Sequence, residues 1–452
     1  MRLVICGAGI IGSNLAHYLS EQGHEVNVIE QKQAVADKIS EKLDVRVLVG
    51  TASDPAVLEE AGVAEADMIV AVTNSDLSNL SICSLAAAYG AKKRIARVRD
   101  RALNEVLKKF GPDHFYVDDI INPDEVASQA IIKVITAPGS RQVADFADGK
   151  ILLRAFDVPE GSPLSGIKLE ELAEKDFPWP FLVVAIRRNG EVVIPYGEDS
   201  INPNDRVYVL LAKESTPEFV TFLNPDAKLP KKVIIYGATA TGISLAQGLS
   251  EKIPEVVLLE ESRIKAEKVA GLLDDVRVTT GSASEADILR ECGVEAADTF
   301  IAVSANDQSN LISAVLAKKL GAGTTVITTN SQDYMAITGA MNIDVVINPR
   351  LLAIDQILKI IRGSQVTTVA TIPECEAEVI ELIPEKDSPI TKKPLRDIKF
   401  PKNSIVGAIY RGNEVILASG STEIKEGEPV VVFCIEDVMH KLEKLFVKKG
   451  IL

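Results

Sequence analysis

Short apolar runs separated by stretches of helical spacing continue through residues 1–137. Continuous apolar runs of this length, each followed by a helical pattern, are typical of strands in a parallel sheet that helices cover on both faces. The pattern therefore predicts an α/β domain built on a doubly wound parallel sheet. The predicted strands are 3–6, 26–29, 45–49, 68–72, 94–98 and 115–117, and the predicted helices are 10–21, 32–42, 54–61, 76–89, 100–109 and 123–136.

Residues 141–225 change to short β-like runs, which predict a smaller α+β lobe. Asn189-Gly190 stands between two of these runs and is a strong hairpin signal, because both residues tolerate a positive φ. The prolines and charges of 212–232 indicate a connector. The runs are 151–158, 181–190, 191–195 and 206–212, and similar runs return at 406–413, 414–418 and 429–435.

The chain is a tandem duplication. Residues 3–30 align with 233–260, with 12 of 28 positions identical, and residues 47–91 align with 278–322, with 20 of 45 identical. Each repeat is therefore expected to be a doubly wound α/β domain followed by a small α+β lobe. The predicted domains are 1–137, 141–225, 231–362 and 366–452, with a helix stop and hinge at Ala137-Pro138-Gly139.

Charge and composition narrow the class of protein. Lys and Arg number 49 against 64 Asp and Glu, a net charge of −15, which argues against a nucleic-acid partner. No run approaches 18 apolar residues, so we expect no membrane-spanning helix. The five cysteines are scattered, without CxxC or a nearby His, so we expect no metal site and a reduced, cytoplasmic chain.

A glycine-rich turn opens the first repeat. It reads Gly7-Ala8-Gly9-Ile10-Ile11-Gly12, directly after a predicted strand and at the start of a predicted helix, which is the context of a Rossmann-like dinucleotide site. In such a site the helix N-terminus receives the diphosphate. Glu30 ends the second predicted strand, where a carboxylate accepts bonds from ribose hydroxyls and repels a 2′-phosphate. The sequence therefore predicts NAD binding in preference to NADP.

Other candidates lie at the same predicted sheet edge. Thr73 and Asn74 follow the fourth strand, and Arg97 ends the fifth, where it offers a cation to a diphosphate. In the second repeat Thr328 replaces Arg97, and Thr239 would crowd a pyrophosphate at the place of the middle glycine. The second pocket is therefore expected to have a poorer phosphate site. Its weaker candidates are Gly237, Ala238, Thr239, Gly242, Glu260 and Ser304.

No catalytic apparatus is recognisable in the sequence. None of the four histidines pairs with a Cys, Ser or carboxylate in a known motif, and the small lobes offer no cluster of His, Lys or Tyr. A dehydrogenase would need an acid or base beside the nicotinamide. A cofactor domain without such a group indicates sensing rather than turnover.

The duplicated pattern resembles a known family. The glycine turn, the segment DMIVAVTNSDLSN (67–79), its echo DTFIAVSANDQSN (298–310) and the paired small lobes resemble RCK domains, regulators of conductance of potassium. Two such modules in one chain resemble the TrkA family, the cytosolic regulatory subunits of Trk-type potassium uptake. The resemblance covers nearly the whole chain. It implies a non-catalytic protein that binds NAD(H) or ATP/ADP and controls an integral-membrane potassium-translocating partner.

The resemblance also implies site roles and an assembly. It places the NAD phosphates on the 7–12 turn, the ribose on Glu30, and further contacts on Thr73, Asn74 and Arg97. Ile10 stands where the related Ktr regulators carry an arginine for the ATP γ-phosphate, and Thr51 where many members carry an aspartate. A dinucleotide is therefore expected in the first repeat. The resemblance leaves ATP or ADP open as a ligand of the second repeat. RCK modules form eight-module gating rings, which implies a homotetramer.

The helices that Pro123 and Pro349 open carry apolar residues on more than one side. We expect one side of each to pack on its own lobe and the other on a partner, in the same chain or another. Two other functions stay open at this point: an NAD-dependent oxidoreductase with unrecognised substrate residues, and a nucleotide sensor for a soluble partner.

Overall fold

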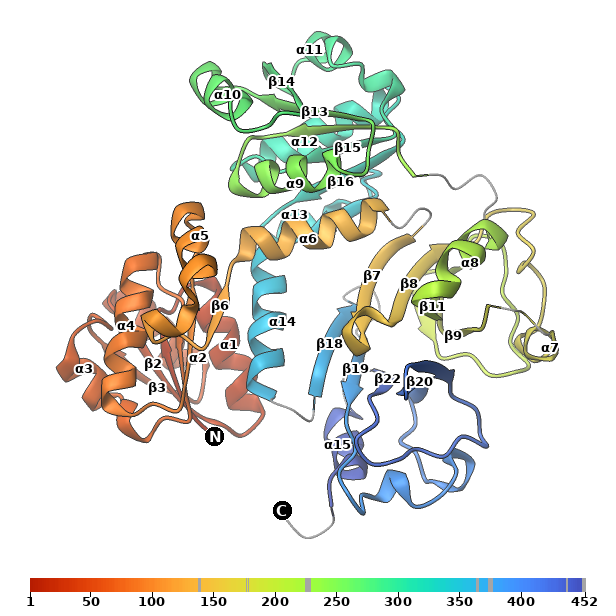
Figure 1. Cartoon of the computed structure of the whole chain (residues 1–452), viewed down its shortest axis with the longest axis horizontal. Helices are drawn as coiled ribbons and strands as arrows, with labels where there is room; N and C mark the ends of the chain where they lie inside the picture. The colour runs from red at the N-terminus through yellow and green to blue at the C-terminus, as the bar shows by residue number, and fades with distance from the viewer. Residues whose placement is uncertain are drawn as a thin grey trace. The chain divides into compact units, whose positions relative to one another are not determined.

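The computed structural model describes residues 1–448 except 137–139, 176, 178, 224–228, 363–365, 373–376 and 436–437 (Figure 1). The hinge expected at 137–139 lies outside these residues. No helix in the described part of the chain is long and apolar enough to cross a bilayer.

The first repeat opens with a six-stranded parallel sheet of order β3-β2-β1-β4-β5-β6. The order reverses between β1 and β4, so a crevice forms at the carboxyl ends of these two strands. The strands are β1 (Arg2–Cys6), β2 (Glu25–Glu30), β3 (Arg46–Val49), β4 (Met68–Ala71), β5 (Lys93–Arg97) and β6 (Asp119–Ile121), and the helices are α1 (Ile10–Glu21), α2 (Gln33–Lys42), α3 (Pro55–Glu60), α4 (Asp76–Tyr89), α5 (Arg101–Phe110) and α6 (Pro123–Thr136).

The second repeat has the same topology, β14-β13-β12-β15-β16-β17, again with parallel pairs. The α/β class and the tandem duplication predicted from the sequence are confirmed. The strands are β12 (Lys232–Tyr236), β13 (Glu255–Glu260), β14 (Arg277–Thr280), β15 (Thr299–Ala302), β16 (Thr324–Thr328) and β17 (Val345–Ile347), and the helices are α9 (Ala240–Ser250), α10 (Arg263–Ala270), α11 (Ala286–Glu291), α12 (Asp307–Lys319), α13 (Gln332–Ile337) and α14 (Pro349–Arg362).

The sixth predicted strand, 115–117, is wrong. Residues Pro112–Phe115 form a 3-10 turn, and Tyr116 has a φ of 57°, a left-handed conformation that a strand cannot contain. Val117 is apolar because it packs into the core under the sheet, not because it belongs to a strand. The strand itself, β6, follows at Asp119–Ile121.

Each repeat ends in an antiparallel five-stranded sheet, β10-β9-β11-β8-β7 in the first and β18-β19-β22-β20-β21 in the second. The hairpin predicted at Asn189-Gly190 is confirmed: β9 pairs with β10, and the two residues have φ of 53° and 91°. The elements are β7 (Ser140–Phe146), β8 (Ile151–Asp157), α7 (Leu169–Glu174), β9 (Phe181–Arg188), β10 (Glu191–Val193), β11 (Arg206–Ala212), α8 (Thr216–Leu223), β18 (Val366–Ile372), β19 (Ala377–Leu382), β20 (Ser404–Arg411), β21 (Glu414–Leu417), β22 (Val430–Ile435) and α15 (Met439–Phe446).

Part of the predicted connector belongs to the first small lobe. Helix α8 buries Phe219, Val220 and Leu223 against the sheet of that lobe. The edge strands β7 and β18 and the inner strand β19 were not predicted either, because none of them carries a long apolar run.

The described chain divides into two compact units. One contains residues 1–131 and 232–361, and the other residues 132–231 and 362–452. The first unit therefore holds both parallel sheets, and the second holds both small lobes. Within the second unit the two small sheets share one core, to which Phe146 and Tyr208 contribute from one repeat and Val379 and Phe433 from the other.

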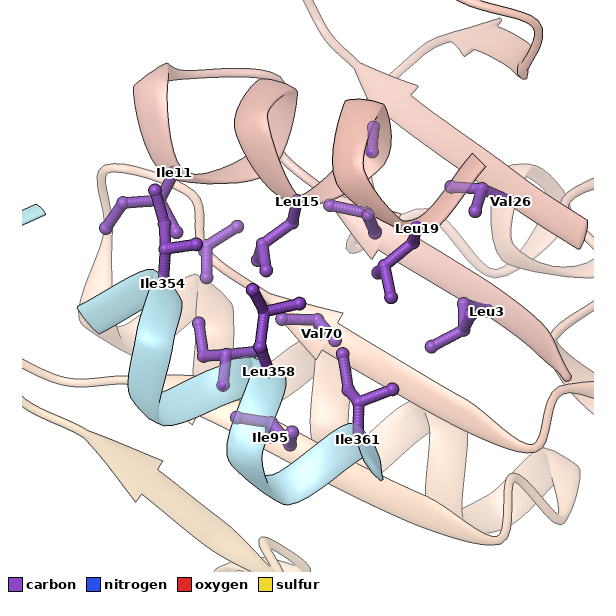
Figure 2. Close-up of a cluster of buried hydrophobic side chains, with 14 of the residues drawn as sticks. Leu3, Ile11, Leu15, Leu19, Val26, Val70, Ile95, Ile354, Leu358 and Ile361 are labelled. Atoms are coloured by element: carbon purple, nitrogen blue, oxygen red, sulfur yellow. The ribbon is translucent and has the colours of Figure 1, made fainter. Parts of the chain in front are cut away.

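In the first unit, helix α14 of the second repeat packs on the first repeat (Figure 2). Ile354, Ile357, Leu358 and Ile361 are buried together with Leu15 of α1 and with residues of β1, β4 and β5. Burying four aliphatic side chains of this size contributes about 1.5–3 kcal/mol each. The hydrophobic core of the first repeat is therefore completed by a helix from the second.

Helix α6 makes the reverse exchange. The Ser128 hydroxyl donates to the Ser244 hydroxyl of α9 at 3.0 Å, and the Thr241 hydroxyl donates to Asp124 at 3.0 Å. Figure 1 shows α6 in orange alongside α9. The apolar residues of both helices, among them Ile131 of α6 and Ile357 of α14, are buried within the single chain. Their pattern therefore no longer supports contact with another copy.

The exchange can be tested with one substitution. Ile357→Ala removes a side chain with 0% exposure from the core of the first repeat and should lower the free energy of unfolding by about 2–5 kcal/mol. Hydrogen exchange should accelerate in β1 and β4, which are far from residue 357 in sequence. Ile264→Ala, at a side chain 82% exposed, is the matched control and should change neither quantity. Faster exchange confined to α14 would contradict the exchanged packing.

Candidate functional site

A cavity of about 670 Å³ opens at the carboxyl ends of the first parallel sheet. Its size falls within the range of small-molecule and cofactor sites. Of the residues predicted for the first repeat, all but Gly12 line this cavity. They are Gly7, Ala8, Gly9, Ile10, Ile11, Glu30, Thr73, Asn74 and Arg97.

The glycine turn is shaped for a close approach to the backbone. Gly7 has a φ of +101°, and a Cβ on Gly12 would lie 1.9 Å from the Gly7 carbonyl oxygen, so Gly12 serves the contact between turn and helix. Gly9 is the N-cap of α1 and supplies no side-chain cap. The N–H groups of the first helical turn, with the positive end of the helix dipole, therefore stay available to an anion.

The backbone holds the Glu30 carboxylate against this turn. Its Oε2 accepts from the Ala8 N–H at 2.8 Å, and its Oε1 accepts from the Lys32 N–H at 2.9 Å. Each carboxylate oxygen has more than one acceptor position, so these bonds orient the group and leave capacity for a ligand hydroxyl.

A buried asparagine organises the wall opposite Glu30. The side chain of Asn79 is fully buried and accepts from the Thr73 N–H at 2.9 Å and from the Thr73 hydroxyl at 2.6 Å. Its amide donates to the Arg97 carbonyl at 2.8 Å. Asn310 makes the equivalent bonds to Ser304 and Thr328. The sequence shows an asparagine at this position in both repeats. It did not show that the side chain joins the ends of two strands.

Two arginines face the cavity. Arg97 comes from β5, as predicted, whereas Arg350 comes from α14 of the other repeat and was not predicted. The pKa of Arg97 is lowered below its usual value, mainly by burial and then by the charges of Arg99 and, more weakly, Arg350. The carboxylates of Asp76 and Asp124 act in the opposite direction. Within the described residues, the Arg97 Nε is buried without a hydrogen-bond partner. The cavity is therefore polarised for an anion.

The second repeat brings its candidates together but bonds them to one another. The Thr239 hydroxyl accepts from the Gly242 N–H at 3.1 Å and donates to the Val303 carbonyl at 2.8 Å. The side chain of Thr239 thus caps α9 at the position that Gly9 leaves open. A Cβ on Gly237 would lie 2.6 Å from the Ser304 backbone, a closer approach than at Gly7.

Glu260 is also occupied within the protein. It accepts from the Ala238 N–H at 2.8 Å and forms a 3.0 Å ion pair with Lys265, which stands where the first repeat has Val35. Burial alone would raise the pKa of Glu260, but the N–H groups of Ser262 and Ala238 and the Lys265 ammonium outweigh it, and the pKa is lowered. The second turn is therefore satisfied by its own side chains.

Known proteins share both the sequence pattern and the fold. The TrkA-N domain family matches residues 3–123 and 233–349, and the TrkA-C domain family matches residues 153–224 and 379–447. The chain is 32% identical over 454 residues to the Trk system potassium uptake protein TrkA of Vibrio alginolyticus, covering 99% of this chain and 98% of that protein. It is 31% identical over 447 residues to the TrkA homolog of Archaeoglobus fulgidus, covering 99% and 100%.

Among solved structures, the GsuK channel bound to NAD has a TM-score of 0.63 to this chain at 16% identity. The match covers 98% of this chain and 78% of that one. This likeness is one of fold.

The internal cap of the second repeat has a measurable effect. Thr239→Ala should destabilise the start of α9 by about 0.5–2 kcal/mol, because the Gly242 N–H loses its acceptor. Hydrogen exchange in Ala240–Ser250 should accelerate accordingly. Thr239→Ser keeps the hydroxyl and should stay close to the parent protein. Equal exchange in the alanine and serine variants would contradict the capping role.

Proposed function

The chain belongs to the TrkA family, and from this premise we propose that it is a regulatory subunit of Trk-type potassium uptake. In this proposal it binds NAD(H) in the cavity of the first repeat and thereby controls an integral-membrane potassium-translocating partner. It acts in the cytoplasm, held at the inner face of the membrane through that partner.

The observation that carries the nucleotide proposal is the composition of the cavity. An uncapped helix N-terminus and two arginines surround the place for a diphosphate, and Glu30 lies where a ribose would offer its hydroxyls. The GsuK channel structure with bound NAD supports the same ligand class.

The cavity lining supports regulation rather than catalysis. No His, Cys or Tyr is present among the residues that line the described cavity. Glu30 is engaged by two backbone N–H groups, and an arginine remains protonated at any physiological pH. A hydride-transfer enzyme needs a proton donor or acceptor at its substrate. Lys32 also lines the described cavity, but it follows Glu30 by two residues and so lies at the ribose end of the proposed site rather than beside a nicotinamide.

The proposal treats the two repeats unequally. The Thr239 cap, the Glu260–Lys265 ion pair and the Asp124 carboxylate at Thr241 occupy the groups that a phosphate and a ribose would use. We therefore assign NAD(H) to the first repeat. ATP or ADP at the second repeat stays a prediction from the resemblance, and these contacts weigh against it.

Binding preference tests the nucleotide proposal. The full chain should bind NAD more tightly than NADP in calorimetric titrations, because the Glu30 carboxylate opposes a 2′-phosphate. Glu30→Ala should weaken NAD binding by roughly 1–3 kcal/mol, the scale of a lost hydrogen bond to a charged group. Glu25→Ala changes the same charge at the exposed start of the same strand and should leave both affinities unchanged. Equal affinity of the parent chain for NAD and NADP would contradict the role of Glu30.

Assembly is a separate part of the proposal. Two RCK modules per chain and eight per ring lead us to propose a homotetramer, supported by the family resemblance. Light scattering on the purified chain should give four times the 48.6 kDa of one chain. A monomer at micromolar concentration, with and without NAD, would remove the ring mechanism and leave a nucleotide-binding protein.

A further inference from the structure

We propose that the second repeat completes the nucleotide site of the first: Arg350, carried by the exchanged helix α14, is a phosphate-binding residue and links occupancy of the first cavity to the second repeat. The inference rests on the proposed binding of NAD(H). The inference goes beyond that proposed binding, because it names a ligand contact that the first repeat alone does not contain.

The position of Arg350 is fixed by the fold. It is the second residue of α14, where its backbone N–H donates to the Asn348 side chain at 3.0 Å. The helix is held against the first repeat by Ile354, Ile357 and Leu358, within the core that α1 and the sheet form. Arg350 thus reaches the cavity from a rigid element whose own chain segment belongs to the other repeat.

The charges at the cavity point to a phosphate ligand. Arg350 and Arg97 both line it, and in the described part of the chain neither forms a salt bridge with a carboxylate. Two guanidinium groups that share a partly buried cavity repel each other. Asp76 and Asp124 offset this repulsion at Arg97 only in part, because the pKa of Arg97 stays lowered. A diphosphate carries two negative charges and suits the planar donor geometry of two arginines.

The mirror position carries the opposite charge. Asn122-Pro123-Asp124 aligns with Asn348-Pro349-Arg350, so the exchange delivers Asp124 to the turn of the second repeat. There the Asp124 Oδ1 accepts from the Thr241 hydroxyl at 3.0 Å, while its Oδ2 accepts from Arg99 at 2.9 Å. One turn therefore receives an arginine and the other a carboxylate. A carboxylate that Arg99 already pairs offers no cation to a phosphate, so the reciprocal exchange itself makes the two sites unequal.

Titration of the full chain with NAD and with adenosine tests the proposal. Arg350→Ala should weaken NAD binding roughly tenfold or more, the scale of a lost charged hydrogen bond, and should reduce its salt dependence. Adenosine lacks the diphosphate, so its affinity should not change. Arg350→Lys should restore part of the NAD affinity. Arg290→Ala, which removes an equal charge from an exposed position outside the cavity, should bind NAD like the parent chain.

The coupling has its own readout. NAD should slow hydrogen exchange in α14 of the parent chain and should do so much less in Arg350→Ala, even at saturating NAD. Unchanged NAD affinity in Arg350→Ala, while Glu30→Ala binds weakly, would overturn this inference and leave the proposed function standing. Equal losses for NAD and adenosine would also overturn it, because they would indicate a general structural effect. A parent chain that binds no NAD would overturn the proposed function and this inference together.

Discussion

The burial of α14 against the first repeat is the contact on which the arrangement of the first unit depends. Its aliphatic side chains lie in one core with α1 and with the strands that carry the glycine turn. Removing this helix would expose that core to water, at a cost of several kcal/mol in a protein class whose total stability is of the order of 5–15 kcal/mol. The two repeats are therefore parts of one cooperative structure. A ligand held at α1 is one helix away from a segment of the other repeat.

The same exchange explains how a duplicated sequence makes two different sites. The repeats share their topology, and both place a carboxylate, Glu30 or Glu260, beside the glycine turn. The repeats differ in which hydrogen-bond and ion-pair partners the groups around that carboxylate have. In the first repeat the helix N-terminus has no side-chain cap, and two arginines face the cavity. In the second, Thr239 and Lys265 take those roles internally. Few substitutions separate an open anion site from a closed one, because backbone N–H groups bond whichever acceptor is nearest.

The framework beneath the sites is the part that duplication preserved. Asn79 and Asn310 are fully buried, and each joins the end of the fourth strand of its sheet to the end of the fifth. A buried amide left unpaired would be costly, so the residues around it are constrained to keep these bonds. The cavity-lining residue Arg97 is not bound by this constraint, and the second repeat has Thr328 in its place. The shared segments at 67–79 and 298–310 thus reflect support of the strand ends more than contact with a ligand.

The sequence by itself determined the duplication, the class of doubly wound parallel sheet, the glycine turn and the Asn189-Gly190 hairpin. Each of these depends on local chemistry: apolar runs, a residue that tolerates a positive φ, a carboxylate at a strand end. It misplaced the sixth strand, because Val117 is buried in the core without being part of a strand. It also missed the strands β7, β18 and β19, which carry no long apolar run. It also indicated that α6 and α14 need a second apolar neighbour. Only the tertiary structure decided that the neighbour is the other repeat, and hence that Arg350 faces the first cavity and Asp124 the second turn. Helical periodicity shows which side of a helix is buried, whereas the surface that buries it depends on contacts between residues far apart in the chain.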